Sequence, residues 1–270
     1  MAPSGSPKSS PSRSAQERRA AQRETLRAQR QAEQRRQRTV RTVVIAAITV
    51  VALVILSGIG LLIYKSMQPE GPVAVPAGMS EDQPYLSLGA PEDSGKPELE
   101  LHLDFMCPHC GTFEEINGQD VAEMVEKEEV TLHLVPRNAL DTASSSGDYS
   151  SRAASALAAV YEEDPAVALK FMQLMFANQP AEGSAGLSDE EIWGYAKEAG
   201  ASEAVQPKIE DGAYVRWVRE VADPYASSVA SGTPYVEIDG TKFEEWTTEG
   251  ALAEAVQAAT GEAAASDGGK

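Results

Sequence analysis

The longest apolar run of the chain lies between Arg41 and Lys65, with no charged residue from Thr42 to Tyr64. At about 1.5 Å per residue, the helical residues 43–64 reach about 33 Å, which is enough to cross a hydrocarbon core of about 30 Å. A cleaved signal peptide is the alternative, but its apolar segment is about 7–15 residues long and ends at a small-residue site. No such site follows Tyr64. The pattern therefore predicts an uncleaved transmembrane signal anchor over residues 43–64.

Beyond residue 96 the apolar positions change to a period of two and then to a helical period. Residues 98–105 alternate apolar and polar side chains, which predicts a strand with its leucines on one face. Residues 108–129 have an apolar stripe at helical spacing, and we expect a helix that is bent or broken at Gly118. Residues 130–135 alternate again and stop at Pro136. Strand, helix and strand in succession form a βαβ unit.

A helical region separates this unit from a closing hairpin. Four helical segments are expected, over residues 150–162, 165–177, 189–200 and 203–221, and Ser188 is the expected N-cap of the third. After them the sequence TPYVEIDGTKFEEW predicts two strands joined by a turn at Asp239-Gly240, followed by a helix over residues 248–259. The order of elements predicts an α/β domain over residues 85–260 with a helical insertion at about 141–226, preceded by one transmembrane helix.

Three further segments lack the periodicity of a packed element. Residues 1–42 are rich in Ser and Pro and then in Arg, Gln and Ala, and we expect a disordered basic tail. Residues 65–84 contain several Pro and Gly residues and predict an extracytoplasmic linker. Residues 261–270 are expected to form a disordered tail.

The formal net charge of −18 divides unevenly along the chain. Residues 1–42 contain eleven Lys and Arg against three Glu, a sum of +8, so residues 65–270 carry −26. The positive-inside rule then predicts a cytoplasmic N-terminus and an extracytoplasmic acidic domain in the cell membrane. The basic tail could instead neutralise nucleic-acid phosphates, but attraction to an anionic inner leaflet is the simpler interpretation.

The chain has two cysteines, in the sequence Cys107-Pro108-His109-Cys110, directly after the first predicted strand and at the start of a helix. Two residues three apart on a helix lie on one face, so the pair can close a small disulfide ring. Pro108 suits the first helical position. Cys107 would stand at the positive end of the helix dipole, which favours a thiolate, and His109 can add a positive charge or a hydrogen bond. The motif predicts a readily donated disulfide.

Two other interpretations of the pair remain open at this stage. A structural disulfide would stabilise little, because a four-residue loop removes little chain entropy. A zinc site would need further ligands from His102, His109 and His133, the only histidines, and no second Cys pair exists. We therefore expect redox chemistry and neither a metal nor a cofactor.

The sequence DFMCPHCGTF, with LGAPEDSGKPELELHL before it and SGTPYVEIDG far downstream, resembles the DsbA-like thiol-disulfide oxidoreductases of the thioredoxin fold, in their membrane-anchored, exported branch. The resemblance covers about residues 85–260. It implies that Cys107 attacks and forms mixed disulfides, while Cys110 resolves them. It also implies that Thr233-Pro234 is a cis-proline dipeptide that faces the cysteines and pairs with an extended substrate.

One departure from the family concerns proton transfer. Many thioredoxin-fold enzymes have a buried acid six residues before the first Cys, and this chain has Leu101 there. Asp104 and Glu100 are the remaining candidates for proton transfer. Strand alternation places Glu100, His102 and Asp104 on one face, and the plainer expectation is a half-exposed polar face.

The combined prediction is an extracytoplasmic dithiol oxidase that acts on exported client proteins with free thiols and binds no nucleic acid. A membrane reoxidase resembling DsbB or the vitamin K epoxide reductase family would return the cysteine pair to its disulfide. Two alternatives stay open. One is a reductase or isomerase fed by a membrane electron donor, and the other is a non-enzymatic binding module with an inert disulfide.

Overall fold

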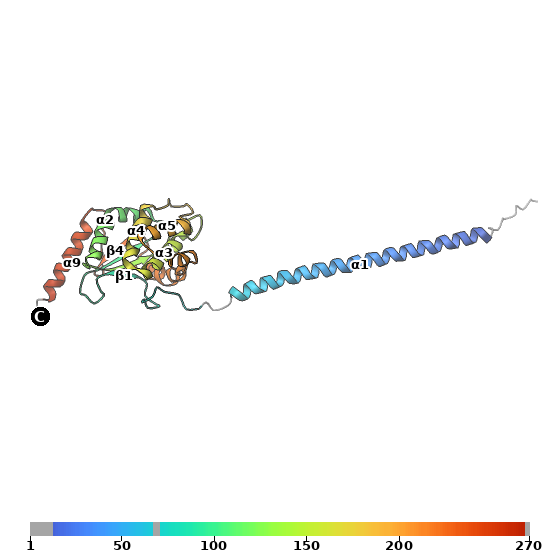
Figure 1. Cartoon of the computed structure of the whole chain (residues 1–270), viewed down its shortest axis with the longest axis horizontal. Helices are drawn as coiled ribbons and strands as arrows, with labels where there is room; N and C mark the ends of the chain where they lie inside the picture. The colour runs from blue at the N-terminus through green and yellow to red at the C-terminus, as the bar shows by residue number, and fades with distance from the viewer. Residues whose placement is uncertain (1–12, 67–70, 268–270) are drawn as a thin grey trace, which may run out of the picture. The chain divides into compact units, whose positions relative to one another are not determined.

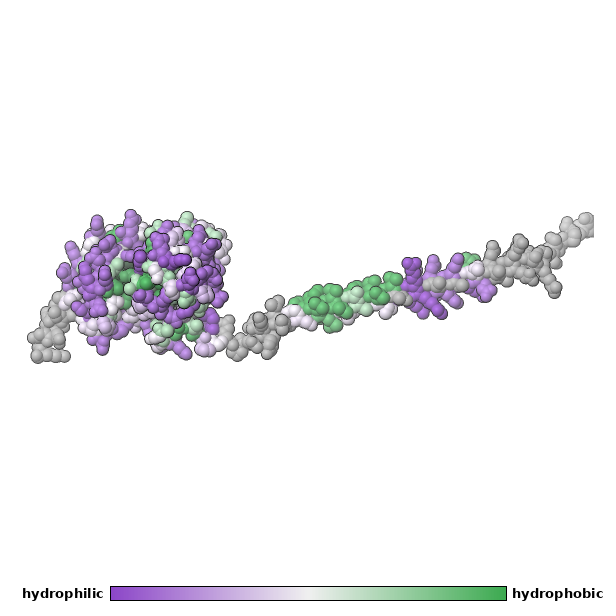
Figure 2. Space-filling view, in the orientation of Figure 1, coloured by the Kyte–Doolittle hydropathy of each residue, from purple (hydrophilic) through white to green (hydrophobic). Residues whose placement is uncertain are grey.

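The computed structural model describes residues 13–66 and 71–267, which belong to two units divided after residue 70. The first unit is a single helix, α1 (Arg13–Ser66). The side chains of residues 43–59 in its apolar part are exposed, with relative accessible surfaces of 66% for Val54 and 63% for Leu56. They belong to the hydrophobic segment seen in Figure 2. By length and composition this helix fits a single-pass membrane anchor.

The basic segment before the anchor differs from the sequence expectation. Helix α1 begins at Arg13, so residues 13–42 are helical rather than irregular. The physical reason is composition, since Ala, Arg, Gln and Glu are all strong helix formers and extend a helix that the apolar segment has already nucleated. Residues 1–12 lie outside the described residues.

Figure 1 shows the second unit, in which helices surround the labelled strands β1 and β4. These strands belong to a five-stranded sheet with the order β1-β3-β2-β4-β5. The strands are β1 (Leu86–Gly89), β2 (Glu98–Leu103), β3 (Thr131–Pro136), β4 (Tyr235–Ile238) and β5 (Thr241–Lys242). Strands β2 and β3 are parallel, as the predicted βαβ unit requires, and the other pairs are antiparallel. Asp239 and Gly240 both have positive φ at the β4–β5 turn, which confirms the predicted hairpin.

Two helices flank the sheet and close its core. Helix α2 (Pro108–Glu126) connects β2 to β3, and α9 (Ala251–Asp267) packs against α2 and β4. Their buried side chains join the strand leucines in one hydrophobic cluster. The predicted break at Gly118 is wrong, because α2 is continuous there. Gly118 is buried, and a Cβ at this position would collide with the carboxyl of Glu114, so the glycine leaves room for that side chain.

The helical insertion begins with a short 3-10 turn (Asp141–Ala143), followed by α3 (Tyr149–Glu163), α4 (Pro165–Ala177) and α5 (Asp189–Ala199). Helix α4 packs against α2, α3 and α5 and thereby joins the insertion to the helix that contains Cys110. The expected Ser188 N-cap is present as a full capping box with Glu191. These three helices agree with the sequence pattern to within about two residues.

The fourth predicted helix is divided into shorter pieces. They are α6 (Gln206–Glu210), α7 (Val215–Trp217), a π-helical segment (Val218–Ala222) and α8 (Asp223–Val229). Gly212 at φ +60° separates the first two, and Pro224 lacks the N–H that an α-helix would need at that point. The backbone accommodates Pro224 by widening into the π turn just before it.

Both ends of the second unit are more ordered than the sequence suggested. Val73, Val75 and Met79, within the predicted linker, pack against the hydrophobic core. At the other end α9 continues to Asp267, beyond the expected helix and into the predicted tail, because that segment is rich in Ala. Residues 268–270 lie outside the described residues.

Candidate active site at Cys107 and Cys110

The cysteine motif occupies the turn between β2 and α2, as its sequence predicts. Cys107 is the N-cap of α2 with extended backbone angles, and Pro108 is the first helical residue. The amide of Cys110 donates to the carbonyl of Cys107 and closes the first turn. Cys110 is fully buried and Cys107 is 6% exposed, while Pro108 and His109 are exposed. Both cysteines are free thiols, so the structure corresponds to the reduced pair.

The pKa values of the two thiols are shifted in opposite directions. A hydrogen bond from Cys110 is the main cause that lowers the pKa of Cys107 to about 5, and contacts from Thr233 and from the amides of Cys110 and His109 lower it further. Burial raises the pKa of Cys110 well above its usual value, and the neighbouring Cys107 adds to the shift. At neutral pH the pair therefore holds one thiolate and one protonated thiol.

The loop before β4 approaches the same sulfur. Thr233-Pro234 is a cis peptide, as the family resemblance implied. Cys107 Sγ lies 3.4 Å from the carbonyl oxygen of Thr233. The predicted substrate-loop residues and the predicted nucleophile thus lie in direct contact.

Asp104 lies directly beside the cysteine pair. Its amide donates to Cys110 Sγ over 3.4 Å. The carboxylate accepts hydrogen bonds from the amides of Met106 (2.8 Å) and Leu140 (2.9 Å) and from the hydroxyl of Ser150 (2.7 Å). Burial raises its pKa to about 6 in spite of these three donors, and the charge of Cys107 contributes to the increase. Asp104 is therefore a buried carboxyl coupled to the reactive thiol.

The expectation of a half-exposed polar face on β2 is wrong. Glu100 is 5% exposed, and His102 and Asp104 are fully buried. Helix α8 covers this face, and Tyr225 donates to Glu100 Oε2 over 2.8 Å. Burial opposes ionisation of Glu100, but hydrogen bonds from His102 and Tyr225 outweigh it and lower the pKa. His102 Nε2 lies 2.5 Å from Glu100 Oε1, and among the described residues no hydrogen bond joins Glu100 to either cysteine.

Two positioning residues were not identified from the sequence. Gln179, after α4, donates to the carbonyl of Cys107 over 2.9 Å and to that of Phe105 over 3.1 Å, and so holds the active-site turn. Arg137 is only 3% exposed, and each of its three guanidinium nitrogens donates a hydrogen bond to helix α8 or to the residue that follows it. Its partners are Asp223 (2.9 Å), Ser227 (2.7 Å) and the carbonyl of Ala230 (3.1 Å). In the sequence Arg137 is marked only by its position directly after a strand, and that position does not indicate which residues it contacts.

One group among the described residues has the side chains to hold a metal ion, namely Glu92, Glu98 and His133. His133 Nε2 lies 2.9 Å from Glu92, and Nδ1 lies 3.2 Å from Glu98. The ring also stacks on Tyr85 at 3.8 Å. Each ring nitrogen already faces a carboxylate, so polar contacts within the chain account for this cluster.

The protein-family model described as Thioredoxin matches residues 87–258. The chain belongs to the thioredoxin family. Among solved structures, oxidized DsbA of Mycobacterium tuberculosis is 29% identical with a TM-score of 0.58, covering 67% of this chain and 98% of that one. DsbG of Mycobacterium tuberculosis is 28% identical with a TM-score of 0.55, covering 71% and 85%.

A more distant relative supports the fold alone. MdbA of Corynebacterium diphtheriae is 23% identical with a TM-score of 0.55, and the match covers 73% of this chain and 98% of the MdbA chain. The comparison with curated proteins gave no match. The structural neighbours are thiol-disulfide oxidoreductases, which confirms the DsbA-like fold and the enzyme class expected from the CPHC sequence.

Proposed function

We propose that this protein is a membrane-tethered, extracytoplasmic dithiol oxidase that introduces disulfides into exported proteins. The opposite shifts of the two thiol pKa values are the observation that carries the proposal. A stabilised Cys107 thiolate favours the reduced pair, and a pair that is more stable when reduced has a more oxidising disulfide. The similar DsbA of Mycobacterium tuberculosis has been solved in both oxidized and reduced forms, which agrees with a pair that cycles.

The reaction consists of two thiol-disulfide exchanges. A client thiolate attacks Cys107 of the oxidised pair, a client–Cys107 bond forms, and the sulfur of Cys110 leaves and takes up a proton. A second client thiolate then attacks the client sulfur, and Cys107 leaves as a thiolate. Its low pKa makes it a good leaving group. Two client thiols lose two electrons and two protons, and the enzyme pair gains the electrons.

Roles for the surrounding residues follow from their contacts. We assign proton transfer to Asp104, because its amide touches Cys110 Sγ and its carboxyl has a pKa of about 6. Glu100 serves the fold through His102 and Tyr225. Thr233 and Pro234 receive the extended client beside Cys107. Pro108 starts the helix, and His109 contributes its backbone N–H to the thiolate.

The anchor and the charge distribution support the proposed location. The exposed apolar segment of α1 follows a region with a net charge of +8, so the N-terminus stays in the cytoplasm and the redox domain lies outside the cell membrane. Such a chain needs a separate partner to regain its disulfide. A membrane reoxidase of the DsbB-like or vitamin K epoxide reductase-like type would accept the electrons, and exported proteins with free thiols are the clients.

Oxidation of a reduced, unfolded client by the purified full-length protein in detergent tests the proposal. We expect stoichiometric disulfide transfer by the oxidised wild type and none by Cys107→Ser. A Cys107→Ser protein that oxidises the client as fast as the wild type contradicts the assignment.

A further inference from the structure

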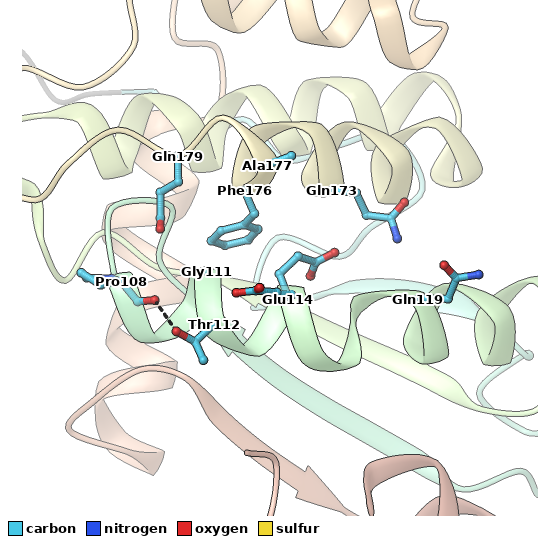
Figure 3. A pocket seen from close by; sticks show the side chains of 10 residues that line it. Pro108, Gly111, Thr112, Glu114, Gln119, Gln173, Phe176, Ala177 and Gln179 are labelled. Atoms are coloured by element: carbon cyan, nitrogen blue, oxygen red, sulfur yellow. Dashed lines mark hydrogen bonds between the residues drawn. The ribbon is translucent and has the colours of Figure 1, made fainter. Parts of the chain in front are cut away.

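A groove of about 660 Å³ lies between α2 and α4, and it starts at Pro108, next to the reactive cysteine (Figure 3). Figure 3 shows Glu114 on the α2 side, with Gln173, Phe176 and Gln179 on the opposite wall. Glu114, Gln173 and Phe176 have no part in the chemistry described above. Gln179 contributes only by its hydrogen bond to the Cys107 carbonyl.

The active-site helix has an open face along this groove. Cys107, Gly111, Glu114 and Gly118 recur at helical spacing and so share one side of α2. A Cβ on Gly111 would collide with the side-chain amide of Gln179, and a Cβ on Gly118 would collide with the carboxyl of Glu114. The two glycines therefore leave room beside the groove for the Gln179 amide and the Glu114 carboxyl.

Glu114 lacks the partner that a carboxyl in such a place needs. Its Oε2 atom is buried without a hydrogen-bond donor among the described residues. Burial, the only cause of the shift, raises the pKa of Glu114 to about 7. Burying a carboxylate without a partner is costly, so this site gains most from a ligand that brings a positive charge and hydrogen-bond donors.

The remaining wall of the groove fits a polypeptide. Gln173 and Gln179 each use their Nε2 on backbone carbonyls, which leaves their amide oxygens to accept from a peptide N–H. Glu115 adds a second carboxylate at the rim. Both charges favour a basic ligand and disfavour an acidic one.

We propose that this groove binds the stretch of client chain beside its reacting cysteine and accepts a lysine or arginine side chain against Glu114. The inference rests on the proposed function and names a substrate preference of the same site. Glu114 follows Cys107 by seven residues, about 10 Å along the helix axis. An extended chain covers that distance in about three residues, so the basic residue lies about three positions from the client cysteine.

The test uses reduced two-cysteine peptides that differ only in having Lys or Gln about three residues from the first cysteine. The rate at which each peptide reduces the oxidised full-length protein is measured at pH 8, where most of Glu114 is ionised. Each of these rates is divided by the rate at which the same peptide reduces a small-molecule disulfide, which removes differences in intrinsic thiol reactivity. We expect a preference for Lys of about tenfold or more in the wild type, the lower limit for one hydrogen bond to a charged group.

Three variants separate the groove from general electrostatics. Glu114→Gln should abolish the preference, whereas Glu126→Gln, an exposed residue of the same helix with the same change of charge, should retain it. Gly118→Ala should also reduce it, because the added methyl group displaces the Glu114 carboxyl. Equal preferences in the wild type and Glu114→Gln, equal losses in Glu114→Gln and Glu126→Gln, or a full preference in Gly118→Ala each overturn the inference. Failure of both peptides to react with the wild type instead overturns the proposed function.

Discussion

Cys107 and Thr233 are 126 residues apart in the sequence, and Cys107 Sγ lies 3.4 Å from the Thr233 carbonyl oxygen. The contact brings the N-terminus of α2 and the loop before β4 to one place. A chain that pairs with this loop therefore lies directly beside the reactive sulfur. The geometry joins binding and nucleophilic exchange in a single site, and its parts can be tested separately.

The first prediction concerns the ionisation of Cys107. Because its pKa is lowered to about 5, thiolate absorbance of the reduced protein should rise around pH 5 and disappear in Cys107→Ser. Because the pKa of Cys107 is lower in the folded than in the unfolded state, its ionisation adds to the free energy of unfolding, and this contribution is complete above about pH 9. The stability difference between the reduced wild type and Cys107→Ser should therefore fall as the pH drops from about 9 to about 5. A difference that stays constant over that range contradicts the low pKa.

The second prediction concerns the order of events at the two cysteines. In Cys110→Ser the resolving sulfur is missing, so Cys107 should remain joined to client proteins, and these adducts should appear on non-reducing gels. Cys107→Ser should form none, because Cys110 is fully buried and protonated. Adducts through Cys110 at a comparable level would reverse the assigned roles.

The third prediction concerns Asp104. Asp104→Asn should lower the pKa of Cys107 further, since a carboxylate that repels the thiolate is removed. Because the amide cannot accept from all three donors, the variant should lose about 1–3 kcal/mol of unfolding free energy near pH 4. The loss should be smaller near pH 8, where the ionised wild-type carboxyl, whose pKa burial has raised, destabilises the fold. Ser150→Ala is the matched control, as it removes one of the three bonds and keeps the charge. A raised Cys107 pKa in Asp104→Asn would show that this coupling is wrong.

The fourth prediction concerns Arg137. Arg137→Met removes the charged partner of Asp223, whose side chain is 20% exposed and keeps a hydrogen bond from Ser227. It also frees the carbonyl of Ala230, so we expect a loss of about 1–3 kcal/mol in unfolding free energy. Arg137→Lys keeps the charge but cannot reproduce the three contacts, and it should be intermediate. Chemical denaturation of the three proteins checks the order. Equal stability of the Lys variant and the wild type would indicate that the charge alone matters.

The fifth prediction concerns topology. In intact cells an external protease should remove a tag placed at the C-terminus and leave an N-terminal tag protected. Protection of both tags, or digestion of the N-terminal one alone, contradicts the proposed orientation.

Local patterns predicted much of this architecture. The cysteine turn, the Ser188 cap and the Asp239-Gly240 hairpin all depend on residues close together in the sequence, and each was found where expected. The burial of Glu100 could not be predicted this way, because it depends on Tyr225, which lies 125 residues further along.

The same limit applies around the active site. Gln179 reaches the carbonyl of Cys107 from 72 residues away, and no local pattern marks it. The open groove beside Glu114 likewise exists only because α4 packs against α2. Sequence periodicity gives the face of a helix, whereas the partner of that face is set by the tertiary fold.

The reduction potential of the Cys107–Cys110 pair tests the central claim most directly, by equilibrating the full-length protein with defined glutathione mixtures and measuring the oxidised fraction. Thioredoxin, a reductant, has a potential of about −270 mV, and strongly oxidising DsbA has about −120 mV. The low pKa of Cys107 predicts a value much closer to the second. A value near or below −270 mV on the same scale would show that the pair reduces its clients, and it would contradict the proposed oxidase function.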